Sequence, residues 1–178
     1  STAYFNDFKE EYQLTNRGIT EQVLRLTGEE KLAVQHFLYK NAKEENKYYK
    51  YDFLFDNCTT RVRDIIINNK KIKPVFKSIV PAGTTFRNAI HQYLDRNDKE
   101  WSKLGIDILL GAPTDKVMDA MQVQFLPNNL MTALDSSNHN NNLVLSKTNL
   151  YEFNQIAPEK SWFNPLIFFS VLLLVIVA

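Results

Sequence analysis

A change in hydrophobic period constrains the local fold of this chain more than any other feature of its sequence. Residues 48–55 alternate between two faces, one of them aromatic, and a period of two predicts a strand. From Val62 onward the apolar residues recur at helical spacing, and Asp56, Asn57 or Thr59 could cap the start of that helix. The sequence therefore predicts a strand that ends near residue 55 and a helix that follows at once.

Cys58, the single cysteine of the chain, falls at this junction. A thiol in the first turn of a helix feels free backbone N–H groups and the positive end of the helix dipole, and both favour the nucleophilic thiolate. A lone cysteine is also often a small buried hydrophobe, and a single one has no internal disulfide partner. The residues alone leave both interpretations open, although the polar neighbours of Cys58 argue against a fully apolar pocket.

The segment 51–64, Tyr-Asp-Phe-Leu-Phe-Asp-Asn-Cys-Thr-Thr-Arg-Val-Arg-Asp, resembles the signature of a Gram-negative envelope family, the Lnb lipoprotein N-acyltransferases. Segments 101–111 and 125–127 match two further blocks of that family, and segment 18–26 also resembles the family's sequences. The resemblance covers residues 1–155, in several spaced blocks.

The resemblance implies an α+β chain with a permuted papain-like thiol fold, akin to the lecithin:retinol acyltransferase group. Cys58 would be the nucleophile, with Asp56, Asn57 and Arg61 as supporting candidates. The general base would be a histidine in a Gly-His block upstream of Ser1. The chain starts with neither Met nor a signal peptide, and we expect a fragment that lacks the N-terminal part of the fold.

The function that this resemblance implies is transfer of an acyl chain from a phospholipid to the N-terminal amine of a lipoprotein, without a cofactor. Phospholipid, lipoprotein and membrane would be the partners, with a membrane-protein complex as a further option. The chain would belong to the inner membrane, with its folded domain in the periplasm. Two alternatives stay open: a cysteine peptidase or amidase of the cell envelope, and a non-catalytic membrane-tethered subunit.

Three histidines are present, and none is preferred as the catalytic base. His36 lies beside the apolar stripe of an expected helix, His91 within another, and His139 in a polar stretch expected to be a loop. A catalytic histidine needs hydrogen-bond reach to the thiol, which a sequence does not establish. The His, Cys and Asp residues lack metal-ligand spacing, so we expect no metal site.

Charge argues against nucleic acid as a partner. Lys and Arg total 21 against 20 Asp and Glu, for a net charge of +1, and no basic stripe interleaved with aromatic residues occurs. The most basic stretch is 68–74, Asn-Asn-Lys-Lys-Ile-Lys-Pro. It is interpreted as a solvated loop, with contact to lipid phosphates as the alternative.

The C-terminal run 166–178 is uncharged and apolar. It is shorter than the ~20 residues that a spanning helix needs, and we interpret it as the start of a transmembrane helix. Trp162 and Phe163 would suit the membrane interface, within a juxtamembrane linker over 158–165. The alternative is a buried terminal strand or helix. Residues 1–157, before the linker, are expected to form the main, periplasmic domain.

The rest of the chain is expected to be mostly helical. The stripe of Trp101, Leu104, Ile108 and Leu109 is expected to pack in the core rather than line a cofactor pocket. Five helices are predicted: one that starts at a Thr27/Glu30 capping box, one over 84–94, one over 98–110, one from Thr114 or Asp115 through Met121, and one that starts at Pro127. A hairpin of strands 143–145 and 150–153 is expected to follow.

Overall fold

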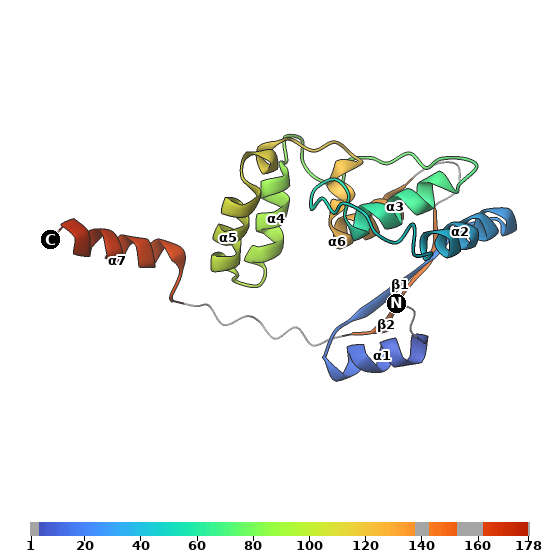
Figure 1. Ribbon diagram of the computed structural model, residues 1–178, viewed down its shortest axis with the longest axis horizontal. Helices are drawn as coiled ribbons and strands as arrows, with labels where there is room; N and C mark the ends of the chain where they lie inside the picture. The colour runs from blue at the N-terminus through green and yellow to red at the C-terminus, as the bar shows by residue number, and fades with distance from the viewer. Residues whose placement is uncertain (1–3, 138–142, 153–161, 178) are drawn as a thin grey trace. The chain divides into compact units, whose positions relative to one another are not determined.

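The computed structural model describes residues 4–137, 143–152 and 162–177. The chain divides into two compact units, one made of Ser1–Ile79 with Ala120–Gln155 and the other of Val80–Asp119 with Ile156–Ala178 (Figure 1). Residues of the predicted periplasmic portion 1–157 contribute to both units. The secondary structure is α+β and mostly helical, as the sequence predicts.

The first unit contains one antiparallel strand pair and several helices. Strands β1 and β2 pair with Ile19 opposite Tyr151 and Leu24 opposite Val144, and this two-stranded sheet is the only sheet among the described residues. The elements in chain order are α1 (Phe5–Leu14), β1 (Ile19–Leu24), α2 (Gly28–Asn41), α3 (Cys58–Asn68), the 3-10 helix η2 (Gln122–Phe125), α6 (Pro127–Ser136) and β2 (Val144–Tyr151).

The core of this unit lies between α3, α6 and the start of β2. Ile66 of α3, Leu130 and Leu134 of α6, and Leu143 form one buried cluster, and partly buried side chains of Leu24, Phe76 and Val144 pack against it. Burial of this apolar surface holds α3 in place beside α6 (Figure 1).

The second unit is built on the hairpin of α4 (Phe86–Asp95) and α5 (Glu100–Leu110), which lie side by side in Figure 1. Phe86, Ala89 and Ile90 are its buried side chains on α4. The 3-10 helix η1 (Ala112–Asp115) and the C-terminal helix α7 (Pro165–Val177) belong to the same unit.

Two strand predictions are wrong. Residues 48–55 form no strand; Asp52 and Asp56 instead make an isolated bridge around a turn. The hairpin expected from 143–145 and 150–153 is the single strand β2, whose partner is β1, although residue 153 lies outside the described residues. A local alternation predicts an extended backbone, but it does not identify the partner that supplies the hydrogen bonds.

The helix predicted through Val117 and Met121 is also wrong. The chain there forms η1 and then an extended segment, in which Val117 makes an isolated bridge to Thr85. The other predicted helices are confirmed as α2, α3, α4, α5 and α6, and the Thr27/Glu30 capping box is present.

The C-terminal run is helical, as α7, and none of its described residues is buried, which rules out the buried strand or helix. Across the described residues, we find no helix with the length and apolar character required to cross a membrane. The stripe on α5 is also not core: Trp101, Ile108 and Leu109 are exposed. Periodicity defines a helix face, but the partner that covers this face depends on the tertiary structure.

Candidate functional site

The segment before Cys58 is a tight turn that Asp52 stabilises. Its carboxylate Oδ1 accepts hydrogen bonds from the backbone N–H groups of Leu54 at 2.9 Å and Phe55 at 3.0 Å. The backbone groups of Asp52 and Asp56 bond to each other in both directions, at 3.1 and 3.0 Å. An Asp side chain that satisfies N–H groups two and three residues ahead favours a turn over a strand.

Asn57 fixes the start of α3. Its Oδ1 accepts from the backbone N–H groups of Thr59 at 2.8 Å and Thr60 at 2.9 Å, and the Thr60 hydroxyl accepts from the Asn57 N–H at 2.9 Å. Its Nδ2 donates to the carbonyls of Phe53 at 2.8 Å and Phe125 at 3.0 Å. The side chain is buried and hydrogen-bonded at both ends, so Asn57 is a helix cap and not a free catalytic amide.

Cys58 is the first residue of α3, and its side chain is exposed to solvent. The prediction that it lies in the first turn of a helix is confirmed, and the interpretation as a buried filler is wrong. Asn57 caps the N–H groups of Thr59 and Thr60, and no acceptor among the described residues binds the N–H of Cys58. An exposed thiol and an unused backbone donor therefore stand together at the positive end of a helix.

Tyr51 lies within electrostatic reach of this thiol. Partial desolvation, followed by the charges of Cys58 and Tyr49, raises the pKa of Tyr51. Since its phenol stays protonated at neutral pH, it is a hydrogen-bond donor in the neighbourhood of the sulfur. The ring of Tyr49 lies 6.2 Å from that of Tyr51.

Asp56 and Arg61 form a bidentate ion pair, in which Arg61 Nε lies 2.7 Å from Asp56 Oδ1 and Nη2 lies 2.9 Å from Oδ2. The Tyr49 ring covers the guanidinium, whose Cζ lies 3.4 Å from the ring centroid. The hydrogen bonds from Arg61 hold the pKa of Asp56 below its usual range, although partial burial opposes this. Asp56 is therefore an ionised partner of Arg61 and not a protonated acid. Both residues line a pocket of about 210 Å³ together with Phe37, Asn41, Asp64, Ile65 and Asn68.

The histidines do not complete a dyad in the described part of the chain. His36 is exposed on α2. His91 Nε2 lies 2.8 Å from Oδ1 of Asp107, in the second unit, and neither histidine is hydrogen-bonded to Cys58. His139 lies outside the described residues. Within the ranges that the structure describes, no group of His, Cys, Asp and Glu could hold a metal ion.

The basic stretch 68–74 is partly neutralised. Lys70 Nζ donates to Glu30 Oε2 at 3.2 Å and to the carbonyl of Arg25 at 2.9 Å, and Lys71 pairs with Glu29. Glu30 is buried and also accepts the N–H of Lys71 at 2.9 Å. This stretch therefore ties α3 to the start of α2, and these pairings do not support the alternative interpretation, a contact with lipid phosphates.

Sequence reasoning missed Asp52, Thr60 and Tyr51 as parts of the site. The spacing of Asn57 and Thr60 is that of a capping box, so Thr60 could have been found. The Phe125 carbonyl could not, because the contact with Asn57 spans 68 positions in the chain.

The fold and this site define a mostly helical α+β protein that presents one exposed thiol at a capped helix start. The model of a known family, the Lnb N-terminal periplasmic domain, matches residues 1–92, just over half of the 178 residues. The chain belongs to this family, whose members are periplasmic domains of cell-envelope proteins. Neither the curated proteins nor the solved structures contain a match.

Proposed function

We propose that this chain is the cysteine-bearing part of an inner-membrane acyltransferase that moves an acyl chain from phospholipid to the N-terminal amine of a lipoprotein. The permuted papain-like fold is part of the same proposal. The observation that carries it is the exposed Cys58 at the first residue of α3. Membership of the periplasmic Lnb domain family supports it, because the substrates of such a reaction meet at the envelope.

The first step forms a thioester. The base takes the thiol proton, the sulfur of Cys58 bonds to the carbonyl carbon of a phospholipid ester, and the bond from that carbon to the glycerol oxygen breaks. The lysophospholipid oxygen takes up the proton that the base holds. In the second step the lipoprotein amine attacks the thioester and loses a proton to a base, while the carbon–sulfur bond breaks. The products are an amide and the regenerated thiolate.

The residues around Cys58 fit separate tasks in these steps. The Cys58 N–H can donate to the oxyanion of each tetrahedral intermediate. Asn57 is a positioning residue, since it orients the first turn of α3 through the Thr59 and Thr60 N–H groups. The general base would be the histidine that the family resemblance implies upstream of Ser1. In the described part of the chain, neither His36 nor His91 bonds to Cys58.

The test uses the full-length protein in vesicles that contain a phospholipid with a labelled acyl chain and a diacylated lipopeptide with a free amine. We expect wild type to give labelled triacylated peptide and a hydroxylamine-labile label on the protein. Cys58→Ala should abolish both signals, whereas Lys50→Ala, a change at an exposed residue just before the turn, should keep them. Full transfer by Cys58→Ala contradicts the proposal.

The same assay separates the alternatives. Release of free fatty acid without transfer, or cleavage of a cell-wall peptide, would replace the acyltransferase by a thiol hydrolase. If wild type forms neither a protein-bound label nor any product, Cys58 has no covalent role, and a non-catalytic membrane-tethered subunit is the better description.

A further inference from the structure

The solvent-facing side of α5 is apolar, which reverses the usual pattern of a surface helix. Trp101, Ile108 and Leu109 are 40%, 76% and 81% exposed, and Gly105 lies on the same face. These positions fall within about a quarter of the helix circumference at 3.6 residues per turn. The opposite side carries the charged residues that bond to α4, such as Asp107.

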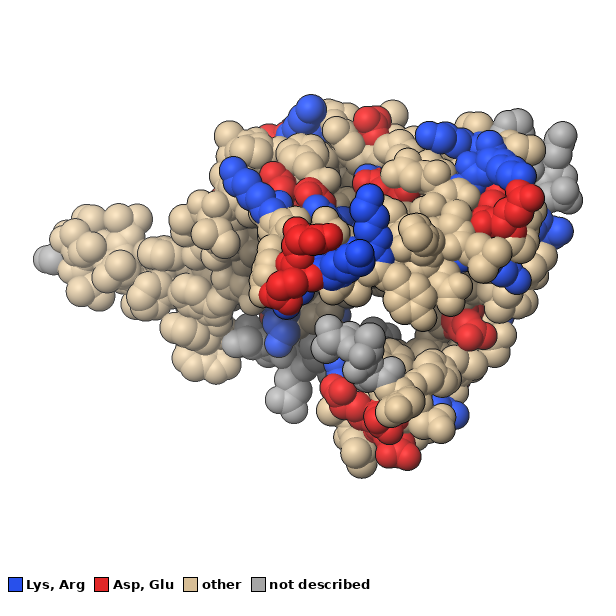
Figure 2. All heavy atoms as spheres, turned by 45° about the vertical axis from the view of Figure 1, so that its right-hand side comes forward, with Lys and Arg blue, Asp and Glu red and all other residues tan. Residues whose placement is uncertain are grey.

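This apolar face is continuous with the aromatic residues that lead into α7. Trp101 Nε1 donates to the Phe163 carbonyl at 3.0 Å, and its ring lies 5.5 Å from the ring of Phe163 and 5.7 Å from that of Phe168. The indole N–H therefore has a partner, while the rest of the ring remains part of the exposed face. Figure 2 shows α7 at the left without any blue or red atoms.

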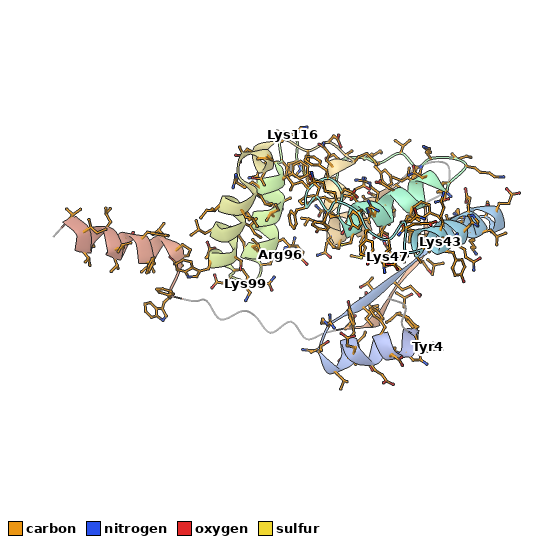
Figure 3. All side chains as sticks on the ribbon, viewed as in Figure 1. Tyr4, Lys43, Lys47, Arg96, Lys99 and Lys116 are labelled. Atoms are coloured by element: carbon orange, nitrogen blue, oxygen red, sulfur yellow. The ribbon has the colours of Figure 1, made fainter. Side chains whose placement is uncertain are left out.

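Two cations stand at the end of the hairpin next to Trp101. Arg96 ends α4 and Lys99 precedes α5, and Figure 3 labels both at this turn. The nearby Lys103 is paired with Asp95 at 2.6 Å and Glu100 at 3.1 Å. No carboxylate among the described residues pairs with Arg96 or Lys99, so both charges are available to an external anion.

We propose that the exposed face of α5, defined by Trp101, Gly105, Ile108 and Leu109, docks the second unit on the surface of a phospholipid bilayer. Ile108 and Leu109 would enter the boundary between headgroups and acyl chains, and Trp101 would lie at headgroup level, where indole rings are enriched. Arg96 and Lys99 would contact anionic headgroups. This surface is separate from the chemistry at Cys58 and does not depend on it.

A bilayer explains these features together better than a protein partner does. An apolar stripe, a tryptophan with its N–H satisfied and two unpaired cations at one end form the arrangement of an interfacial helix. The uncharged α7 touches the same stripe through Phe168 and would share its environment. A second copy of the chain with its α5 parallel to this one would bring Arg96 and Lys99 against like charges, and an antiparallel copy would leave both without an anionic partner on its apolar face.

The test follows Trp101 fluorescence in the full chain, with Trp162→Phe so that Trp101 is the only tryptophan. The protein is mixed with vesicles of phosphatidylethanolamine and phosphatidylglycerol that carry bromine on the acyl chains. We expect a blue shift and quenching by the brominated lipid, with protection from aqueous iodide. A Trp101 that iodide quenches fully and brominated lipid does not would overturn the proposal.

Further variants separate the contribution of α5 from that of α7, whose uncharged helix would also partition into vesicles. In the same background, Ile108→Ser with Leu109→Ser should lose the lipid quenching of Trp101 while the chain still co-sediments with vesicles. Leu14→Ser, equally exposed but on α1, should change neither signal. Quenching that survives the α5 double variant contradicts the assignment of this face.

Charge is tested by Arg96→Gln with Lys99→Gln, which should reduce Trp101 quenching on vesicles with phosphatidylglycerol and leave it unchanged on phosphatidylcholine alone. Equal effects on both vesicles would remove the headgroup contact from the proposal. Cys58→Ala should keep the full quenching, so a failure of the proposed acyl transfer and a failure of this docking surface are distinguished. Self-association that blocks quenching would identify a second copy as the occupant instead.

Discussion

Asn57 uses its side chain to join three stretches of backbone, since it caps α3 and also donates to the carbonyls of Phe53 and Phe125. The sequence suggested Asn57 as a supporting residue of the catalytic site, and the structure gives it a definite role beside Cys58. Its importance is geometric, because the position of the thiol depends on the first turn that Asn57 orders.

Replacing Asn57 by Ala should therefore destabilise the first unit. The change removes a cap and the donor to two carbonyls, one part-buried (Phe53) and one buried (Phe125). We expect a loss of about 2–4 kcal/mol in the free energy of unfolding, measured in urea. Asn57→Asp keeps the capping oxygen and loses only the Nδ2 donor, so its loss should be smaller. An unchanged urea midpoint for Asn57→Ala would show that the cap is dispensable.

Glu30 is a buried carboxylate whose ion pair depends on pH. Hydrogen bonding by the Thr27 N–H is the largest effect and outweighs the opposing desolvation, and with Lys71 and Lys70 it lowers the pKa of Glu30. A carboxylate whose pKa is lower in the folded state stabilises that state above its unfolded pKa. The stabilisation is lost as the pH falls through the lowered value.

Glu30→Gln should reduce the unfolding free energy at neutral pH by about 2–3 kcal/mol, because Lys70 loses its charged partner. The difference between this variant and wild type should shrink as the pH falls below about 4.5, the ordinary value for the group. Thermal unfolding followed by circular dichroism at several pH values measures it. Glu29→Gln, which breaks an exposed pair with Lys71, is the matched control and should change little. A pH-independent difference would contradict the role of the Glu30 charge.

At the scale of elements, Arg87 joins α4 to α5 and η1. Its guanidinium donates to Asp107, to Asp115 at 2.6 Å and to the Gly111 carbonyl at 3.1 Å. Desolvation alone would raise the pKa of Asp107, but the bonds from His91 and Arg87 hold it below its usual range. The hairpin is therefore fastened by a planar cation that satisfies three acceptors at once.

Replacing Arg87 by Ala should loosen the α4–α5 hairpin, and amide hydrogen exchange measured by mass spectrometry should speed up in peptides that cover 86–110. Arg87→Lys should give an intermediate rate, since an ammonium does not reproduce the guanidinium fork. Arg17→Ala, which breaks the exposed pair with Glu11, is the control and should leave these peptides unchanged. Equal exchange rates in Arg87→Ala and wild type would show that packing alone holds the hairpin.

The sequence predicts helices well where the cap and the apolar period agree, as for α3, which begins with Asn57 and buries Ile66. It fails at 48–55, because the Asp52 carboxylate captures two N–H groups that a strand would share with a neighbour. It also fails for β2, whose partner β1 lies more than a hundred positions earlier, as the bond from Thr20 to Asn149 shows. Exposure of Cys58 is likewise a tertiary property that no local pattern contains.

At the scale of the whole molecule, the net charge of +1 is nearly balanced, so the proposed membrane attachment would rest mainly on apolar surface, above all on α7. Replacing Leu173 and Leu174 by Arg should lower vesicle partitioning at least about 100-fold, because two apolar side chains are lost and two charges must approach the lipid. Co-sedimentation with phosphatidylcholine vesicles measures this. Leu14→Arg with Ile72→Arg adds the same charge at exposed sites of the first unit and should have little effect. Unchanged partitioning of the α7 variant would show that α7 does not carry the attachment.

The bond from Asn57 to the Phe125 carbonyl has a consequence for how the chain acquires its structure during synthesis. A ribosome releases the segment around Cys58 long before η2, α6 and β2. The cap of α3 is local, but the bond from Asn57 to Phe125 and the cluster around Ile66 must wait for residues that emerge later. Closing such a loop costs entropy that local turns do not incur. A piece that ended at residue 92, where the family match stops, would contain the cysteine but lack the carbonyl and the leucines that hold its helix.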